Sequence, residues 1–318
     1  MKTIFAIVMC ISCSVIFTSK ADAFWVWTPK TNKFVNPKKA AKDTPEGQFK
    51  WAMRFFKDKD YKRAAEEFAS LTAQFKDSHL APEAQYYVGR AYEAAGKYYP
   101  AFQAYQKTVG AYPFTERIDE IIRREYDIGI VLYRKHRGTF MGKEIMTDLD
   151  RAVEIFDKVK NNAPFGEYAA KAQFMIGECY KKSEQYDQAA EAYQKMLDEY
   201  PKSVFAVKAK YEAAQAVYLA SLKSDYDQER TDLAIKEFKE VAKDYKGLPV
   251  SNEASVAIAL LEDRKAESLF KTAKFYESQK HYKSAAIYYR EILVSYPRGS
   301  FGESAREHLS SIEGFLKD

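Results

Sequence analysis

The sequence predicts an all-α fold in which helical hairpins stack side by side into one superhelical solenoid. Small and aromatic residues recur at fixed offsets in successive segments, and most of these segments close on a proline. Aromatic residues make up 15% of the chain, against only 13 glycines and 10 prolines, which suits long runs of helix with ring-packed seams. One hairpin cannot bury its own apolar face, so several copies are needed to form a core.

The first segment in chain order, residues 1 to 23, has the features of a secretory signal. Lys2 precedes a short apolar run that ends in the small-x-small motif Ala21 to Ala23. This run is shorter than the roughly 20 residues of a membrane-spanning helix. We therefore expect removal of the segment after Ala23. The alternative is a lipoprotein modified at Cys13, but Cys10 stands where a lipobox expects leucine or a similar residue.

Removal of the signal would leave Cys179 as the only cysteine of an exported chain. Such a chain has no internal disulfide, so helix packing must supply its stability. We expect Cys179 to be a small buried residue on a first helix, without a role as a nucleophile.

Residues 24 to 48 are expected to form an extended lead-in, because they contain three prolines and no helical period. The aromatic cluster Phe24, Trp25 and Trp27 stands beside lysines and could enter a membrane interface or dock on the first repeat. A simple tether is the alternative.

The net charge of +5 is concentrated before the repeats. The signal carries +1 and the lead-in +3, which leaves +1 for the rest of the chain. A nearly neutral body with mixed signs is typical of a solvated helical surface and argues against nucleic acid as a partner.

The clearest repeat spans residues 170 to 203. Gly177, Tyr180, Ala189, Tyr193 and Pro201 stand at the small, aromatic and closing positions of a tetratricopeptide repeat. The small residues let two antiparallel helices cross closely, the tyrosines fill the space beside them, and Pro201 ends the second helix.

About six such repeats and a C-terminal capping helix, at 303–316, are expected to form the solenoid over residues 49–318. The repeats are placed near 46–78, 82–115, 122–165, 170–203, 207–248 and 266–299. Insertions around 137–147 and 221–230 interrupt the third and fifth copies, and the last first helix is expected to be long, from about Asn252 to Gln279. The small positions that define the crossings include Gly89, Ala101, Gly177, Ala189, Ala273 and Ala285.

An aromatic residue precedes the small position of each first helix by three residues. The six are Phe49, Tyr86, Tyr126, Phe174, Tyr211 and Phe270. If first helices line a concave face, this aromatic ladder is a candidate surface for a partner's helix or extended segment. The alternative is that each ring packs inside its own hairpin.

No pattern for catalysis is present. The four histidines are isolated, with no HExxH motif, no G-x-S-x-G elbow and no glycine-rich phosphate loop. We therefore expect a protein that is not an enzyme and uses no metal, cofactor or small-molecule substrate.

The C-terminal half resembles a known family more closely than a generic repeat. The motif Pro164-Phe165-x-x-Tyr168 opens the fourth repeat, and the stretch 260–297 begins Leu-Leu-Glu-Asp-Arg. Both resemble the BamD (YfiO) family of outer-membrane assembly lipoproteins, with similarity over roughly residues 163 to 315. The first two repeats lie outside that family's usual five-repeat layout.

This resemblance implies a periplasmic scaffold at the inner face of the outer membrane. Its expected partners are the BamA-type insertase, other subunits of the assembly complex and unfolded outer-membrane proteins. Asp263, Arg264 and Glu267 would correspond to the insertase side, and the groove of the earlier repeats to the substrate side. Two other scaffolds share the repeat features: a coordinator resembling the repeat protein of the Tol-Pal system, which usually has an N-terminal coiled coil, and a polysaccharide-assembly scaffold.

Overall fold

The computed structural model describes residues 26–28, 33–35, 42–135, 147–222 and 228–316. The expected signal, both of its cysteines, Phe24, Trp25 and most of the two insertions lie outside these ranges. Within them the chain forms thirteen α-helices and two short strands, which confirms the all-α repeat solenoid.

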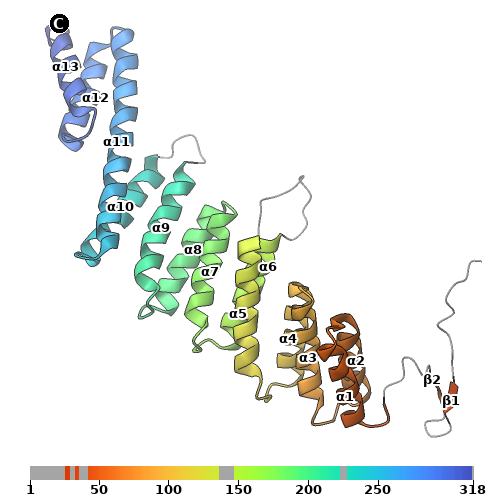
Figure 1. Ribbon diagram of the computed structural model, residues 1–318. Coiled ribbons are helices and arrows are strands. Elements are labelled where there is room, and N and C mark those ends of the chain that lie inside the picture. The colour runs from red at the N-terminus through yellow and green to blue at the C-terminus, as the bar shows by residue number, and fades with distance from the viewer. Residues whose placement is uncertain (1–25, 29–32, 36–41, 136–146, 223–227, 317–318) are drawn as a thin grey trace, which may run out of the picture.

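The helices form six consecutive hairpins and a terminal helix (Figure 1). Their bounds are α1 Pro45–Lys57, α2 Tyr61–Gln74, α3 Ala81–Ala94, α4 Tyr98–Ala111, α5 Ile118–Lys135, α6 Asp148–Asn162, α7 Ala169–Lys182, α8 Tyr186–Glu199, α9 Ala206–Ser221, α10 Gln228–Asp244, α11 Pro249–Ser278, α12 Tyr282–Ser295 and α13 Gly302–Ile312. The short 3-10 helix η1, Glu313–Phe315, follows α13.

Helix boundaries follow local sequence signals. The Thr44 hydroxyl accepts a hydrogen bond from the Gly47 amide and caps α1, so the first helix begins four residues before the expected start of the solenoid at residue 49. Thr147 and Asp150 form a reciprocal capping box at the start of α6. Gly96 lies in the turn between α3 and α4 with a φ of +70°, a conformation that costs glycine little.

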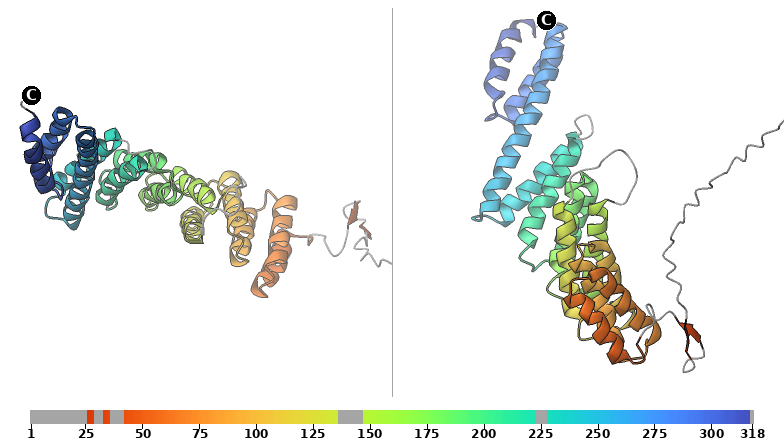
Figure 2. Two further views of the ribbon diagram at one scale, coloured as in Figure 1. Left: turned by 90° about the horizontal axis from the view of Figure 1, so that it is seen from above. Right: turned by 45° about the vertical axis from the view of Figure 1, so that its right-hand side comes forward.

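The lead-in contains two strands that the sequence did not predict. Strand β1, Val26–Thr28, pairs antiparallel with β2, Lys33–Val35, and Trp27 lies opposite Phe34. This hairpin lies beyond the α1 end of the solenoid (Figure 2).

Successive hairpins stack into a twisted, elongated array, and the apolar core follows it as a series of clusters (Figures 1 and 2). Helix α11 departs from the regular pattern because it has 30 residues, against 14 in α12. Its first half packs in the cluster of α9 and α10, and its second half packs in the cluster of α12 and α13. One helix is therefore shared by the fifth and sixth repeats.

Candidate functional site

The aromatic residues of the first helices lie inside their own hairpins. Each ring meets an aromatic ring of the second helix, at centroid distances of 5.3 to 5.9 Å. The six pairs are Phe49 and Phe68, Tyr86 and Tyr105, Tyr126 and Phe156, Phe174 and Tyr193, Tyr211 and Phe238, and Phe270 and Tyr289. Aromatic pairs at this separation add to hairpin stability.

This geometry favours the alternative, in which each ring packs inside its own hairpin. Tyr86 is 1% exposed and Phe174 is 4% exposed, so neither ring offers a surface for binding. The rings turn inward because the seam between two closely crossing helices provides their largest apolar contact. Phe49, Tyr126, Tyr211 and Phe270 are only partly buried, and their use by a partner stays a prediction.

The predicted small positions are buried inside the hairpins. Ala101, Ala189, Ala273 and Ala285 have no exposed surface. A Cβ atom added to Gly177 would lie 2.5 Å from Cε1 of Tyr193, and Gly89 lies in the same way beneath Tyr105. At Gly89 and Gly177 the tyrosine ring leaves no room for a larger side chain.

A polar network joins the second repeat to the third. The Arg124 guanidinium on α5 donates to Glu120 at 2.9 Å and to Glu93 on α3 at 3.1 Å. The Tyr86 hydroxyl donates to Glu120 at 2.5 Å. Burial alone would raise the pKa of Glu120, but the Tyr86 and Arg124 hydrogen bonds prevail and lower it to about 2. The network therefore stays charged at neutral pH and fixes the angle between two repeats.

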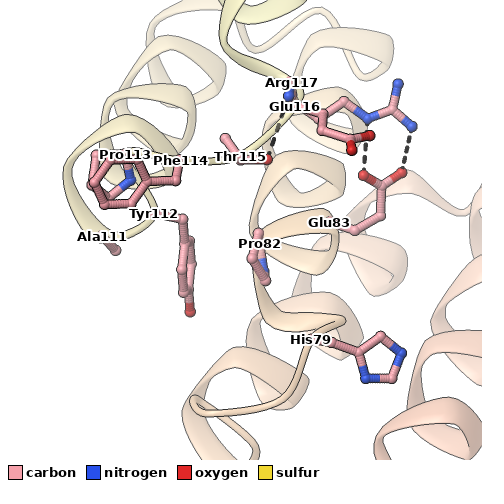
Figure 3. A pocket seen from close by; sticks show the side chains of 10 residues that line it. All are labelled: His79, Pro82, Glu83, Ala111, Tyr112, Pro113, Phe114, Thr115, Glu116 and Arg117. Carbon is pink, nitrogen blue, oxygen red and sulfur yellow. Dashed lines mark hydrogen bonds and ion pairs between the residues drawn. The ribbon is translucent and has the colours of Figure 1, made fainter.

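A cavity of about 650 Å³ lies at this same junction, between the α2–α3 and α4–α5 loops (Figure 3). Tyr112, Pro113 and Phe114 line one side. On the other side the Arg117 guanidinium forms a bidentate pair with Glu83, with donor–acceptor distances of 2.9 and 2.7 Å. The cavity is thus apolar on one side and polar on the other, where His79, Glu83 and Arg117 lie.

Two phenylalanines are fully exposed on the edge of the solenoid formed by the α4–α5 and α6–α7 loops, which we call the loop edge. This feature was not predicted from the sequence. Phe114 is 97% exposed in the α4–α5 loop, and Phe165 is 102% exposed in the α6–α7 loop. Each directly follows a proline in the loop that closes a repeat. The Pro-Phe dipeptide in the closing loop was the available signal. Exposed rings beside a cavity mark a candidate interaction surface.

The three residues predicted for the insertase side make separate intramolecular contacts near the middle of α11. The Asp263 carboxylate accepts from the Ser300 amide at 2.7 Å and from the Ser300 hydroxyl at 2.5 Å, which ties α11 to the α12–α13 loop. The Arg264 guanidinium donates to the Tyr218 hydroxyl on α9 at 3.0 Å. Glu267 pairs with Lys271 one turn along the helix, at 2.7 Å.

Buried glutamines hold the two helices of several hairpins together. Gln48, Gln85 and Gln173 each donate Nε2 to the backbone carbonyl 19 residues later, at 2.9 to 3.3 Å. Glu125 occupies the same position in the third repeat, one residue before the first-helix aromatic.

Glu125 is less well satisfied than these glutamines. It has no exposed surface and accepts from Gln106 Nε2 at 2.8 Å, while its Oε2 atom has no hydrogen-bond partner. Burial raises the pKa of this carboxyl to about 8. The side chain therefore holds its proton near neutral pH.

Metal ligands, membrane-spanning helices and the free thiol can each be assessed in the described part of the chain. It contains no group of three or more His, Cys, Asp or Glu side chains placed to hold a metal ion. None of its helices combines the length and hydropathy needed to span a bilayer. Cys179 is buried on α7, and burial raises the pKa of its thiol to about 12, which keeps it in the unreactive thiol form.

Comparison with known proteins confirms the resemblance seen in the sequence. The family model YfiO, described as outer membrane lipoprotein, matches residues 132–313. A tetratricopeptide repeat model matches residues 49–115. The outer membrane protein assembly factor BamD of Rickettsia prowazekii is 23% identical over 171 residues, which are 54% of this chain and 64% of that protein. This chain thus spans less than two thirds of its relative's length.

Solved structures give weaker similarities. MamA from Desulfovibrio magneticus is 20% identical over 64% of this chain and 96% of its own, with a TM-score of 0.31. A repeat-containing protein from Cytophaga hutchinsonii is 16% identical over 83% of this chain and 88% of its own, with a TM-score of 0.36. At these scores, neither adds to the fold described above.

Proposed function

We propose, from the premise that the chain belongs to the YfiO family of outer membrane lipoproteins, that it is a scaffold for the assembly of β-barrel proteins into the outer membrane. The family match over residues 132–313, more than half of the chain, carries this proposal. The proposed role is not enzymatic. The mechanism is to hold partners in a set geometry without making or breaking a bond.

The proposed location is the periplasm, at the inner face of the outer membrane. We expect export by the N-terminal signal and cleavage before Phe24. The intact mass of the mature protein, purified from its own envelope, tests this point. A diacylated Cys13 as the mature N-terminus would contradict cleavage at Ala23.

The proposed insertase contact is the middle of α11. Arg264 is half-buried and, among the described residues, its guanidinium has a single hydrogen bond, to Tyr218. A guanidinium has five N–H donors, so most of its fork is available for a carboxylate of a partner. Asp263 and Glu267 lie within one turn of it on the same helix. We propose that these three residues form the insertase side.

The proposed contact with unfolded barrel proteins is the loop edge with Phe114 and Phe165. These rings are exposed, whereas Tyr86 and Phe174 of the aromatic ladder are buried. An unfolded barrel strand presents apolar side chains on alternate residues, which fits separate exposed rings.

Binding of the full chain to the periplasmic domains of the BamA-type insertase tests the function. Arg264→Glu should weaken this affinity about thirtyfold or more. The substitution places a negative charge opposite the partner's carboxylate in a contact that excludes water. Tyr218→Phe is the matched control, since it removes the same intramolecular hydrogen bond but keeps the cation. Melting curves of both variants report on the fold.

Absence of binding by the wild-type chain would refute the assembly function. Equal affinities of wild type and Arg264→Glu, at equal melting temperatures, would instead remove only Arg264 from the interface.

A further inference from the structure

The outer face of α12 differs from that of every other second helix. Counting from the crossing alanine, the second and ninth following positions point outward in each repeat. They hold Glu66 and Ala73, Gln103 and Gly110, Glu154 and Asn161, Glu191 and Asp198, and Lys236 and Lys243 in the first five repeats. In α12 the same positions hold Ile287 and Val294. Only the sixth repeat therefore presents two branched apolar side chains where the others present polar or small ones.

Both side chains point into solvent. Ile287 is 62% exposed and Val294 is 80% exposed. They are seven residues apart, which places them on one face, about 10 Å apart along the axis. The core of this repeat is formed by the opposite face of α12, through residues such as Ala285, Tyr289 and Ile292. Packing among the described residues thus gives no reason for the apolar pair.

Unpaired cations surround this pair. Lys283 and Arg290 are exposed on the same side of α12, and Arg298 follows the end of the helix. Within the described residues, none of the three has an ion pair or a side-chain hydrogen bond, and Glu291 is the one carboxylate between them. The surface is therefore apolar at its centre and mainly basic at its edge.

We propose that this surface, formed by Lys283, Ile287, Arg290, Val294 and Arg298, docks an acidic amphipathic helix of a partner protein. Ile287 and Val294 form a single narrow row of side chains. Such a row fits into the groove between side-chain ridges on another helix. Acidic side chains on the partner complement the three cations. A membrane-binding face would need a broad apolar side with inserted aromatic residues, and two aliphatic side chains do not provide it. The proposal does not depend on the insertase contact, which lies in the middle of α11.

Site-specific photo-crosslinking of the full chain in its own envelope tests the proposal. A photo-crosslinking residue is incorporated at Glu291, between the two apolar side chains, and the captured peptide is read by mass spectrometry. The matched control position is Lys195 on α8, which has the same register. We expect an adduct at position 291, and not at 195, with a segment that has apolar residues at three- and four-residue spacing and an excess of Asp and Glu.

Two variants make the result specific. Ile287→Ser with Val294→Ser should lower the yield of this adduct at least tenfold without lowering the melting temperature, because both side chains are exposed. Arg290→Glu keeps the apolar pair and should lower the yield by repulsion. Adducts only with phospholipid, a captured segment that is basic or lacks an apolar face, no adduct, or equal yields from the variants would each overturn the proposal.

Discussion

Replacing Glu125 by glutamine should stabilise the third repeat, and increasingly so as the pH rises. Glutamine at this position keeps an oxygen that accepts from Gln106 Nε2, as Glu125 does at 2.8 Å. It also supplies an amide donor for the Ile155 carbonyl, the counterpart of the carbonyls that Gln85 and Gln173 reach. The buried Oε2 atom that lacks a partner is thereby replaced by a satisfied group.

The size of the effect follows from the pKa of the carboxyl. Burial raises this pKa from an ordinary 4.5 to about 8, so between these values the folded state binds a proton that the unfolded state has released. The free energy of unfolding therefore falls by about 1.4 kcal/mol per pH unit across this window. Across the full window the free energy of unfolding would fall by about 5 kcal/mol at most. Because the site can relax, we expect a loss of about 2 to 4 kcal/mol.

Urea unfolding of both proteins at pH 5, 6.5 and 8.5 measures this difference. At pH 5 the protonated glutamic acid can itself donate a hydrogen bond, so the two proteins should agree within about 1 kcal/mol. At pH 8.5 the Glu125→Gln protein should be the more stable. If the free energies of unfolding of the two proteins changed with pH in parallel, the reasoning would be refuted. The Glu125 carboxyl would then have the same pKa in the folded and unfolded chains.

Three further outcomes are expected. Gly177→Val should destabilise the fold by about 1 to 3 kcal/mol, because a Cβ would overlap the Tyr193 ring, whereas Glu191→Ala on the exposed face should not; equal thermal midpoints would contradict this packing. Asp263→Ala should remove both hydrogen bonds to Ser300 and speed amide hydrogen exchange in α13; unchanged exchange would show that this contact does not hold the helix. Iodoacetamide at pH 8 should leave Cys179 unmodified in the native chain and label it in urea, as peptide mapping can check; labelling in native buffer would contradict its burial and raised pKa.

The hairpins were predictable because their determinants are local. The small residue and the aromatic of each crossing lie on adjacent helices of one repeat, so fixed sequence offsets predict them. The inward direction of the first-helix rings was harder to predict. In four repeats the paired rings are 19 residues apart, as in Tyr86 and Tyr105, and this spacing was the available signal. Two insertions hide it in the third and fifth repeats.

The contacts of α11 could not be predicted from sequence spacing. Asp263 meets Ser300, 37 residues later, and Arg264 meets Tyr218, 46 residues earlier. Both contacts depend on where the middle of a double-length helix passes the neighbouring repeats, which no local pattern encodes. The apolar pair on α12 is different, since aligning the repeats with one another would have identified Ile287 and Val294.

The length of α11 also has a mechanical consequence. Its 30 residues correspond to a continuous rod about 45 Å long. The other described boundaries between repeats are loops, whose backbone angles can change when the repeats move, although the Arg124 network restrains the boundary between the second and third repeats. Between the fifth and sixth repeats no such joint exists, since Ala254 near one end and Ala273 near the other are buried in different clusters of the same helix. A force applied to α12 and α13 would therefore be transmitted through α11 to α9 and α10. The fifth and sixth repeats should move as one rigid unit.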